Sequence, residues 1–147
     1  PSQGDLIQRK LFTVHFHLYA SAKYLNEHGT PNRIEDLPGH KIISYGQAPD
    51  YLKEINWLES ITKEYKTKPI LKVDNINGLL LAAISHIGIV LLPDYLVNNS
   101  NALVRIPFNS KLPEIDTYMT YAEERKKSKR VAILREFLVE EGRRWSF

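Results

Sequence analysis

The sequence contains no cysteine, and this absence excludes disulfide bonds, thiolate metal ligands and cysteine nucleophiles together. No apolar run reaches the roughly 20 residues that a membrane-spanning helix requires, and residues 1–10 are too polar for a secretory signal. The net charge is only +3 and the basic residues are scattered, so composition gives no support for direct DNA contact. With ordinary apolar and charged fractions of 43% and 25%, we expect a soluble, cytoplasmic protein without membrane contact.

Familiar catalytic motifs are also missing. The sequence has no G-x-S-x-G elbow, no phosphate-binding loop and no H-E-x-x-H pair. His15 and His17 share one face of a predicted strand and could form half of a metal site, but no third ligand follows at a matching spacing. A polar strand face explains the two histidines better. We therefore expect no enzyme, no metal site and no cofactor.

The clearest pattern lies between Lys68 and Asn98. Residues 68–73 are typical of a short strand, and the adjoining Asp74-Asn75 supplies the side chains that begin helices. Apolar residues then recur at helical spacing, which predicts a helix over 76–87: Ile76, Leu79, Leu80, Ala83, Ile84 and Ile87. We expect Gly88 to end this helix in a left-handed conformation.

The residues after Gly88 predict a second strand. Ile89 to Leu92 is apolar without alternation, as in a parallel strand that is covered on both faces. Pro93 should end this strand and begin a short helix, Asp94 to Asn98. The result is a β-α-β-α unit whose strands end at one edge of the sheet, where open α/β folds bind ligands.

Shorter patterns flank this unit. Leu11 to Tyr19 alternates as a strand, and Ser21 can cap a helix over Ala22 to Glu27 with Tyr24 and Leu25 as its buried pair. The remaining expected elements are a strand over 42–45, a surface loop over 47–54, a helix over 56–65 with Tyr65 on its apolar face, and strands over 103–107 and 116–122.

The last third of the chain is expected to end in an amphipathic helix. Glu123 to Arg130 is rich in basic residues, a composition that suggests phosphate or DNA binding, but a solvated loop before a helix explains it better. Apolar residues in 131–141 form a helical stripe that should dock on a core, with Gly142 ending the helix: Val131, Leu134, Phe137 and Leu138.

Two stretches together resemble the effector-binding domain of bacterial LysR-type transcriptional regulators. The first pattern, A-S-x-x-Y-L-x-x-x-G-x-P followed by D-L-x-x-H, is met by Ala20, Ser21, Tyr24, Leu25, Gly29, Pro31, Asp36, Leu37 and His40. The second is met by Val73, Asn75, Leu79, Leu80, Ala82, Ala83, Gly88, Ile89, Leu92, Pro93, Tyr95 and Leu96. The order, the spacing and the closing segment Arg125 to Leu138 also agree.

The resemblance implies an α/β fold of the type 2 periplasmic-binding-protein kind, with two lobes joined by crossing strands. Residues 21–115 would form the second lobe, and residues 11–20 and 116–147 would be crossing strands and remnants of the first. We expect a fragment that lacks the winged helix-turn-helix and most of the first lobe. Departures from the family pattern are Ala22 in place of a proline and His86 in place of a glycine; we expect a surface histidine.

In this fold, ligand contacts gather at strand carboxyl ends and helix amino ends. That singles out seven candidate ligand-binding residues: Ser21, Ser44, Tyr45, Asp74, Asn75, Asn77 and Pro93. Free amides near Asn75 would suit a carboxylate, whereas Asp74 would repel one unless it turns away. The alternative is that Ser21, Asp74 and Asn75 only cap helices.

The resulting hypothesis is a sensor module in which a small organic anion or amino acid shifts the balance between two lobe arrangements. DNA would be bound only through a helix-turn-helix absent from this chain. The alternatives are a solute-binding protein of the same fold, or an interaction fragment without ligand. We expect a homodimer or higher oligomer, because the strand over 70–74 and an unpaired edge beside Leu11–Tyr19 could pair between chains.

Overall fold

The computed structural model describes residues 6–97 and 101–144, which form two compact units. The larger unit runs from His15 to Pro113, and the smaller comprises 6–14 and 114–144 of the described residues. The lobe boundaries expected from the sequence, after residues 20 and 115, lie near the limits of these units and stay a prediction. Within the described residues, no helix is both long and apolar enough to span a bilayer.

Strand β4 (Val90–Pro93) lies at the centre of the larger unit. It pairs antiparallel with β1 (Leu6–Ala20), which also pairs with β5 (Val104–Arg105). On its other side, a parallel bridge between Ile42 and Ile89 joins it to the parallel pair of β2 (Ile43–Tyr45) and β3 (Leu71–Val73). The prediction that 89–92 runs parallel to 70–73 is thus confirmed, with β2 between them.

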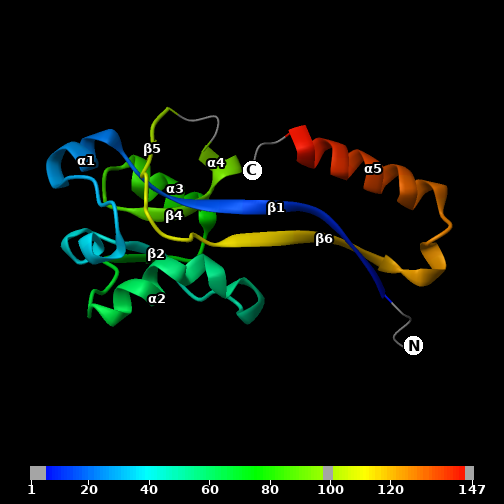
Figure 1. The fold of residues 1–147 in the computed structure, drawn as a ribbon, viewed down its shortest axis with the longest axis horizontal. Coiled ribbons are helices and arrows are strands. Elements are labelled where there is room, and N and C mark those ends of the chain that lie inside the picture. Colours follow the sequence, from blue (N-terminus) through cyan, green and yellow to red (C-terminus); the bar gives the residue numbers. More distant parts are fainter. Residues whose placement is uncertain (1–5, 98–100, 145–147) are drawn as a thin grey trace. The chain divides into compact units, whose positions relative to one another are not determined.

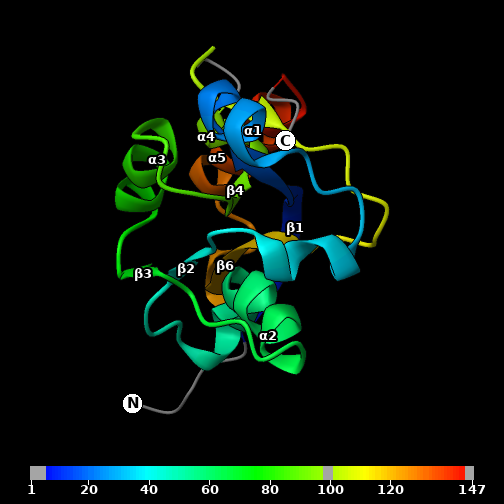
Figure 2. The same cartoon turned by 90° about the vertical axis from the view of Figure 1, so that its left-hand side faces the viewer.

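Two helices cover opposite faces of these strands. Helices α3 (Ile76–Ile84) and α2 (Trp57–Glu64) lie on opposite sides of β2 in both views (Figures 1 and 2). The predicted helical stripe of α3 is confirmed, because Leu79 and Ala83 are buried in a core shared with β1 and β4. The prediction for α2 holds less well: Leu58 and Thr62 are its buried residues, and Tyr65 is exposed.

The end of α3 differs from its prediction. The helix stops at Ile84, and the left-handed residue is His86, at φ 64°, rather than Gly88. Gly88 is required for a different reason, because a Cβ there would lie 2.3 Å from the carbonyl oxygen of Lys41. The next residue, Ile89, donates its N–H to that same carbonyl at 2.8 Å. Glycine is therefore required at position 88 because a distant segment approaches closely, and not because the helix ends there.

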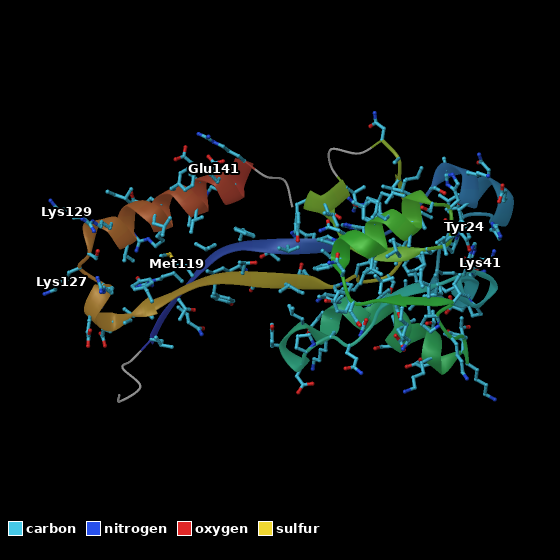
Figure 3. All side chains as sticks on the ribbon, turned by 180° about the vertical axis from the view of Figure 1, so that it is seen from behind. Tyr24, Lys41, Met119, Lys127, Lys129 and Glu141 are labelled. Carbon is cyan, nitrogen blue, oxygen red and sulfur yellow. The ribbon has the colours of Figure 1, made fainter. Side chains whose placement is uncertain are left out.

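The first helix confirms its prediction. Ser21 caps α1 (Ala22–His28) by accepting the N–H of Tyr24 at 3.1 Å, and Gly29 ends it at φ 84°. The Tyr24 hydroxyl is buried and accepts the N–H of Lys41 at 2.8 Å, so the two residues lie side by side (Figure 3). A short 3-10 helix, η1 (Ile34–Gly39), connects α1 to β2.

Two predicted boundaries were wrong in the remainder of this unit. Pro93 belongs to β4, where it faces Phe16, and α4 (Asp94–Val97) begins after it; Asn98 lies outside the described residues. Phe16 directs its N–H away from β4, to the Pro113 carbonyl at 3.1 Å. Pro93 can therefore face Phe16 although it has no backbone N–H to donate. The predicted surface loop over 47–54 contains a 3-10 helix, η2 (Asp50–Asn56).

In the smaller unit, β6 (Glu114–Ala122) pairs with β1, and η3 (Glu123–Arg125) leads to α5 (Lys129–Arg144). Asp116 of β6 accepts a hydrogen bond from Thr13 at 2.7 Å. Two predictions for α5 were wrong. Gly142 lies inside the helix, where a Cβ would meet the Phe12 ring at 2.6 Å. The apolar stripe is only partly covered, since Leu134 and Phe137 are exposed.

The contact at Gly88 predicts the effect of a single added methyl group. Gly88→Ala should lower the free energy of unfolding by about 1–3 kcal/mol, because the Cβ can be accommodated only by moving β4 or the Lys41 backbone. Gly39→Ala is the matched control, since nothing lies within 4 Å of a Cβ there. Urea denaturation measures both. Equal stability of the two variants would contradict the proposed role of Gly88.

Candidate functional site

The carboxyl ends of β2 and β3 bring several candidate residues together. The Tyr45 hydroxyl donates to the Asp74 carbonyl at 3.1 Å, and the Gln47 N–H donates to Asp74 Oδ1 at 2.9 Å. Gly46 permits this packing, because a Cβ there would lie 1.8 Å from Asp74 Oδ1. The Asp74 carboxylate is exposed and held in place at this edge of the sheet.

The first turn of α3 extends the same edge. Asn75 Oδ1 accepts the N–H groups of Asn77 and Gly78 at 2.8 and 3.1 Å. Two of the amides that were expected to suit a carboxylate are therefore already satisfied by the cap. The Asn77 side chain is exposed and makes no hydrogen bond to any other residue that the structure describes. We refer to Tyr45, Asp74, Asn75 and Asn77 as the carboxyl-edge cluster.

Ser44 points away from this cluster and into the protein. It is buried, and its hydroxyl donates to Glu59 Oε2 at 2.8 Å, while Lys72 Nζ lies 2.6 Å from Glu59 Oε1. Burial raises the pKa of the Glu59 carboxyl, but the hydrogen bonds from Lys72 and Ser44 outweigh burial, so its pKa lies below the ordinary value. Ser44 thus positions a carboxylate on α2.

The two remaining candidates lie at opposite edges of the sheet. Pro93 is buried at the carboxyl end of β4, the edge at which β2 and β3 also end. Ser21 follows β1, which runs the other way, since Tyr19 faces Val90 at the beginning of β4. Its hydroxyl lies 2.8 Å from His86 Nδ1, so the predicted surface histidine has a partner there. The structure therefore separates Ser21 from the carboxyl-edge cluster.

A buried carboxylate that the sequence analysis missed lies directly after Pro93. Asp94 is only 8% exposed, and its Oδ1 accepts the Tyr19 hydroxyl at 2.9 Å and lies 2.7 Å from His17 Nδ1. Arg105 NH1 lies 3.8 Å from Asp94 Oδ2, and Arg105 NH2 contacts His17 Nε2. Burial, followed by the bond to Asp94, raises the pKa of the Tyr19 phenol well above its usual range.

These contacts fix the hydrogen-bonding state of His17. A guanidinium can only donate, so Nε2 of His17 must accept from Arg105, and Nδ1–H must donate to Asp94. Both ring nitrogens are therefore engaged with protein partners, which leaves no lone pair for the metal that was considered for His15 and His17. No group of three potential metal-binding side chains occurs in the described residues.

A cavity of about 700 Å³ lies next to Arg105 in the larger unit. His15, Phe16 and His17 of β1 form one wall. The other lining residues belong to the segment after β4 and α4: Arg105, Ile106, Pro107, Phe108, Asn109, Ser110, Leu112 and Pro113. We refer to this space as the Arg105 cavity. It shares no lining residue with the carboxyl-edge cluster.

Comparison with known proteins gives a consistent family. The family model described as the LysR substrate binding domain matches residues 1–143. The HTH-type transcriptional regulator CrgA of Neisseria meningitidis is 31% identical over 142 residues, covering 94% of this chain and 47% of the relative. An uncharacterized HTH-type transcriptional regulator of Haemophilus influenzae is 29% identical over 128 residues, covering 83% and 43%. The chain thus spans about half the length of these curated relatives.

Solved structures agree with this result. The regulatory domain of CrgA superimposes with a TM-score of 0.70 at 27% identity, covering 96% of this chain and 71% of that structure. The Synechocystis PCC6803 CcmR regulatory domain, solved in complex with 2-PG, gives a TM-score of 0.69 with coverage of 97% and 69%. Its identity is only 12%, so it supports the fold alone.

The bond between Ser44 and Glu59 predicts a pH-dependent loss of stability. Ser44→Ala should lower the free energy of unfolding by about 1–3 kcal/mol near neutral pH, because it removes a donor to a charged acceptor. Because the folded pKa of Glu59 lies below its ordinary 4.5, the bond stabilises the fold above that pH. The difference from wild type should therefore narrow as the pH falls through the folded pKa.

Ser60→Ala is the matched control, since that hydroxyl donates to the Asn56 carbonyl at 3.0 Å and not to a carboxylate. Urea titrations from neutral to acid pH measure both variants. A Ser44→Ala deficit that stayed constant with pH would show that Ser44 does not act through Glu59.

Proposed function

The chain belongs to the family of LysR substrate-binding domains, and from this we propose that it is the effector-sensing part of a longer DNA-binding transcription regulator. The family has the type 2 periplasmic-binding-protein fold, which agrees with the mixed α/β structure. The similar curated proteins are named as transcriptional regulators. In this proposal, DNA contact belongs to a helix-turn-helix outside the 147 residues, and the protein works in the cytoplasm.

The convergence of β2 and β3 is the observation that supports this function most directly. Their parallel register places Tyr45, Asp74 and Asn75 at one sheet edge, and the first turn of α3 adds Asn77. Ligands of open α/β folds bind at such an edge, where strand carboxyl ends and helix amino ends meet. We place the effector at the carboxyl-edge cluster.

The charges of this cluster select between the two proposed classes of effector. Asp74 contributes an exposed carboxylate, and Asn75 already occupies two amides of α3. A simple organic anion would therefore be repelled by Asp74 and would find few free donors. The ammonium group of an amino acid would instead pair with Asp74, and Asn77 can donate to its carboxylate. We propose an amino acid or a similar zwitterion.

The smaller unit supports the proposed two-lobe organisation. Leu134 and Phe137 of α5 are exposed although they lie on the apolar stripe of the helix. The chain covers 71% of the solved CrgA regulatory domain, so that domain has further sequence with which such a helix could pack. We propose that 21–115 is the second lobe, and that 11–20 and 116–147 connect to the first.

Binding should be detectable by thermal unfolding in the presence of a panel of amino acids, with their amides and simple carboxylates for comparison. We expect at least one amino acid to raise the unfolding temperature, since a ligand that binds only the native state stabilises it. Asn77→Ala should weaken that binding by roughly tenfold, the loss expected from one hydrogen bond to a charged group.

Asn26→Ala is the control, because Asn26 is exposed on α1 and follows Ser21 at the opposite edge of the sheet. Equal affinity of the two variants for the ligand would contradict binding at the carboxyl-edge cluster. A panel in which only simple carboxylates bound, without dependence on Asn77, would contradict the proposed class of effector.

We also propose that the chain forms a dimer through β3. Ile70, directly before this strand, is 55% exposed, and β3 pairs only with β2 among the described residues. The prediction of an open edge beside Leu11–Tyr19 was wrong for residues 16–19. These residues pair with β4 on one side and form backbone hydrogen bonds with the segment after Arg105 on the other.

Sedimentation equilibrium tests this assembly. Wild type should be dimeric at high concentration, and Ile70→Lys should shift the equilibrium toward monomer by placing a charge at the edge strand. Tyr51→Lys is a control at an apolar residue that is 79% exposed elsewhere on the same unit. A monomeric wild type, or equal dissociation of both variants, would contradict pairing through β3.

A further inference from the structure

The Arg105 cavity combines a cationic side with an apolar side. Its polar lining consists of His15, His17, Arg105, Asn109 and Ser110, and none of the described residues that line it is acidic. Phe108 and Leu112 provide apolar surface. A volume of about 700 Å³ lies within the range of small-molecule sites, which are mostly apolar with a few placed polar groups.

Protein contacts position the guanidinium of Arg105 at the cavity but leave some of its N–H donors free. Its strand position is fixed, because Arg105 pairs with Tyr19 across β1 and β5. The side chain contacts His17 Nε2 and lies 3.8 Å from Asp94, yet it remains 57% exposed. A guanidinium has five N–H donors, so these two contacts leave donors for a ligand.

The buried carboxylate of Asp94 does not disfavour an anion in the Arg105 cavity. Asp94 does not line the cavity, and its carboxylate already accepts from Tyr19 and His17. If Arg105 turned toward a ligand, Asp94 would keep both of these bonds and lose only a contact of 3.8 Å. The rearrangement would not leave an unpaired buried charge, which is the usual cost of such a change.

We propose that the Arg105 cavity is a second ligand site, which binds a small carboxylate with an aromatic or branched apolar body. The carboxylate accepts from Arg105, with Asn109 and Ser110 beside it, and the apolar body packs against Phe108 and Leu112. This site is separate from the carboxyl-edge cluster, whose exposed Asp74 disfavours the same ligand.

The protein contains its own reporter for this cavity. The ring of Trp57 packs edge-on against Phe108, with ring centroids 6.4 Å apart. The sequence has only one other tryptophan, Trp145, so a Trp145→Phe background leaves Trp57 as the sole source of tryptophan fluorescence. Phenylacetate is a suitable probe, and phenylacetamide has the same shape without the charge.

Titration of the Trp145→Phe chain with phenylacetate should give a saturable change in Trp57 fluorescence, and phenylacetamide should bind at least about tenfold more weakly. Arg105→Gln should weaken phenylacetate binding by at least about tenfold, the loss expected for a charge-assisted pair. Arg33→Gln is the matched control, because this exposed arginine pairs with Asp36 and does not line the cavity. Asn77→Ala should also have no effect.

The proposal would be overturned by no saturable response, by equal binding of the acid and the amide, or by equal affinity of Arg105→Gln and Arg33→Gln. Loss of binding in Asn77→Ala alone would place the ligand at the carboxyl-edge cluster and likewise refute the second site. Arg105→Lys covers the case in which Arg105→Gln unfolds, since it keeps the charge near Asp94. It should retain the preference for the acid but bind it more weakly, because an ammonium lacks the bidentate fork.

Discussion

The pairing of β4 on both of its edges determines the arrangement of the larger unit. All four residues of this strand are buried, so its backbone groups must find partners within the protein. One edge pairs antiparallel with β1. On the other edge, Ile89, directly before β4, forms a parallel bridge with Ile42, and its carbonyl accepts the N–H of Ile43 at 2.9 Å. Consequently β2, β3 and β4 end at one edge of the sheet and β1 ends at the other. This alone places Asp74 and Ser21 far apart although both follow a strand.

Local sequence patterns predicted the elements well where the physical cause is local. The stripe of α3 and its cap depend on residues within a few positions of Asn75, and both are confirmed. The cap of α1 by Ser21 is predictable for the same reason. Gly88 was misinterpreted because its requirement comes from the Lys41 carbonyl, 47 positions away in the chain. A pattern of helix termination could not reveal that contact.

The residues of the candidate site likewise divide into those that local sequence rules predict and those that depend on distant contacts. Tyr45, Asp74 and Asn75 follow from the rule that parallel strands end together, which depends only on β-α-β order. Ser44 bonds Glu59 and does not join this group, because successive side chains of a strand point to opposite faces. Asp94 was treated only as the first residue of a short helix. Its partners His17 and Tyr19 lie 77 and 75 positions away, and no spacing in the sequence links them.

The two proposed ligand regions differ in charge because the fold exposes one nearby carboxylate and buries the other. At the carboxyl edge, Asp74 keeps its charge exposed, with its Oδ1 held by one backbone amide. Beside the Arg105 cavity, Asp94 is buried and its oxygen is satisfied by a phenol and an imidazole, so its charge is directed into the protein. The guanidinium is then the charge that the cavity presents. A zwitterion with a cationic end would suit the first proposed region, and a carboxylate with an apolar body would suit the second. Exposure of Asp74 and burial of Asp94 would thus let the two proposed sites discriminate between two ligand classes.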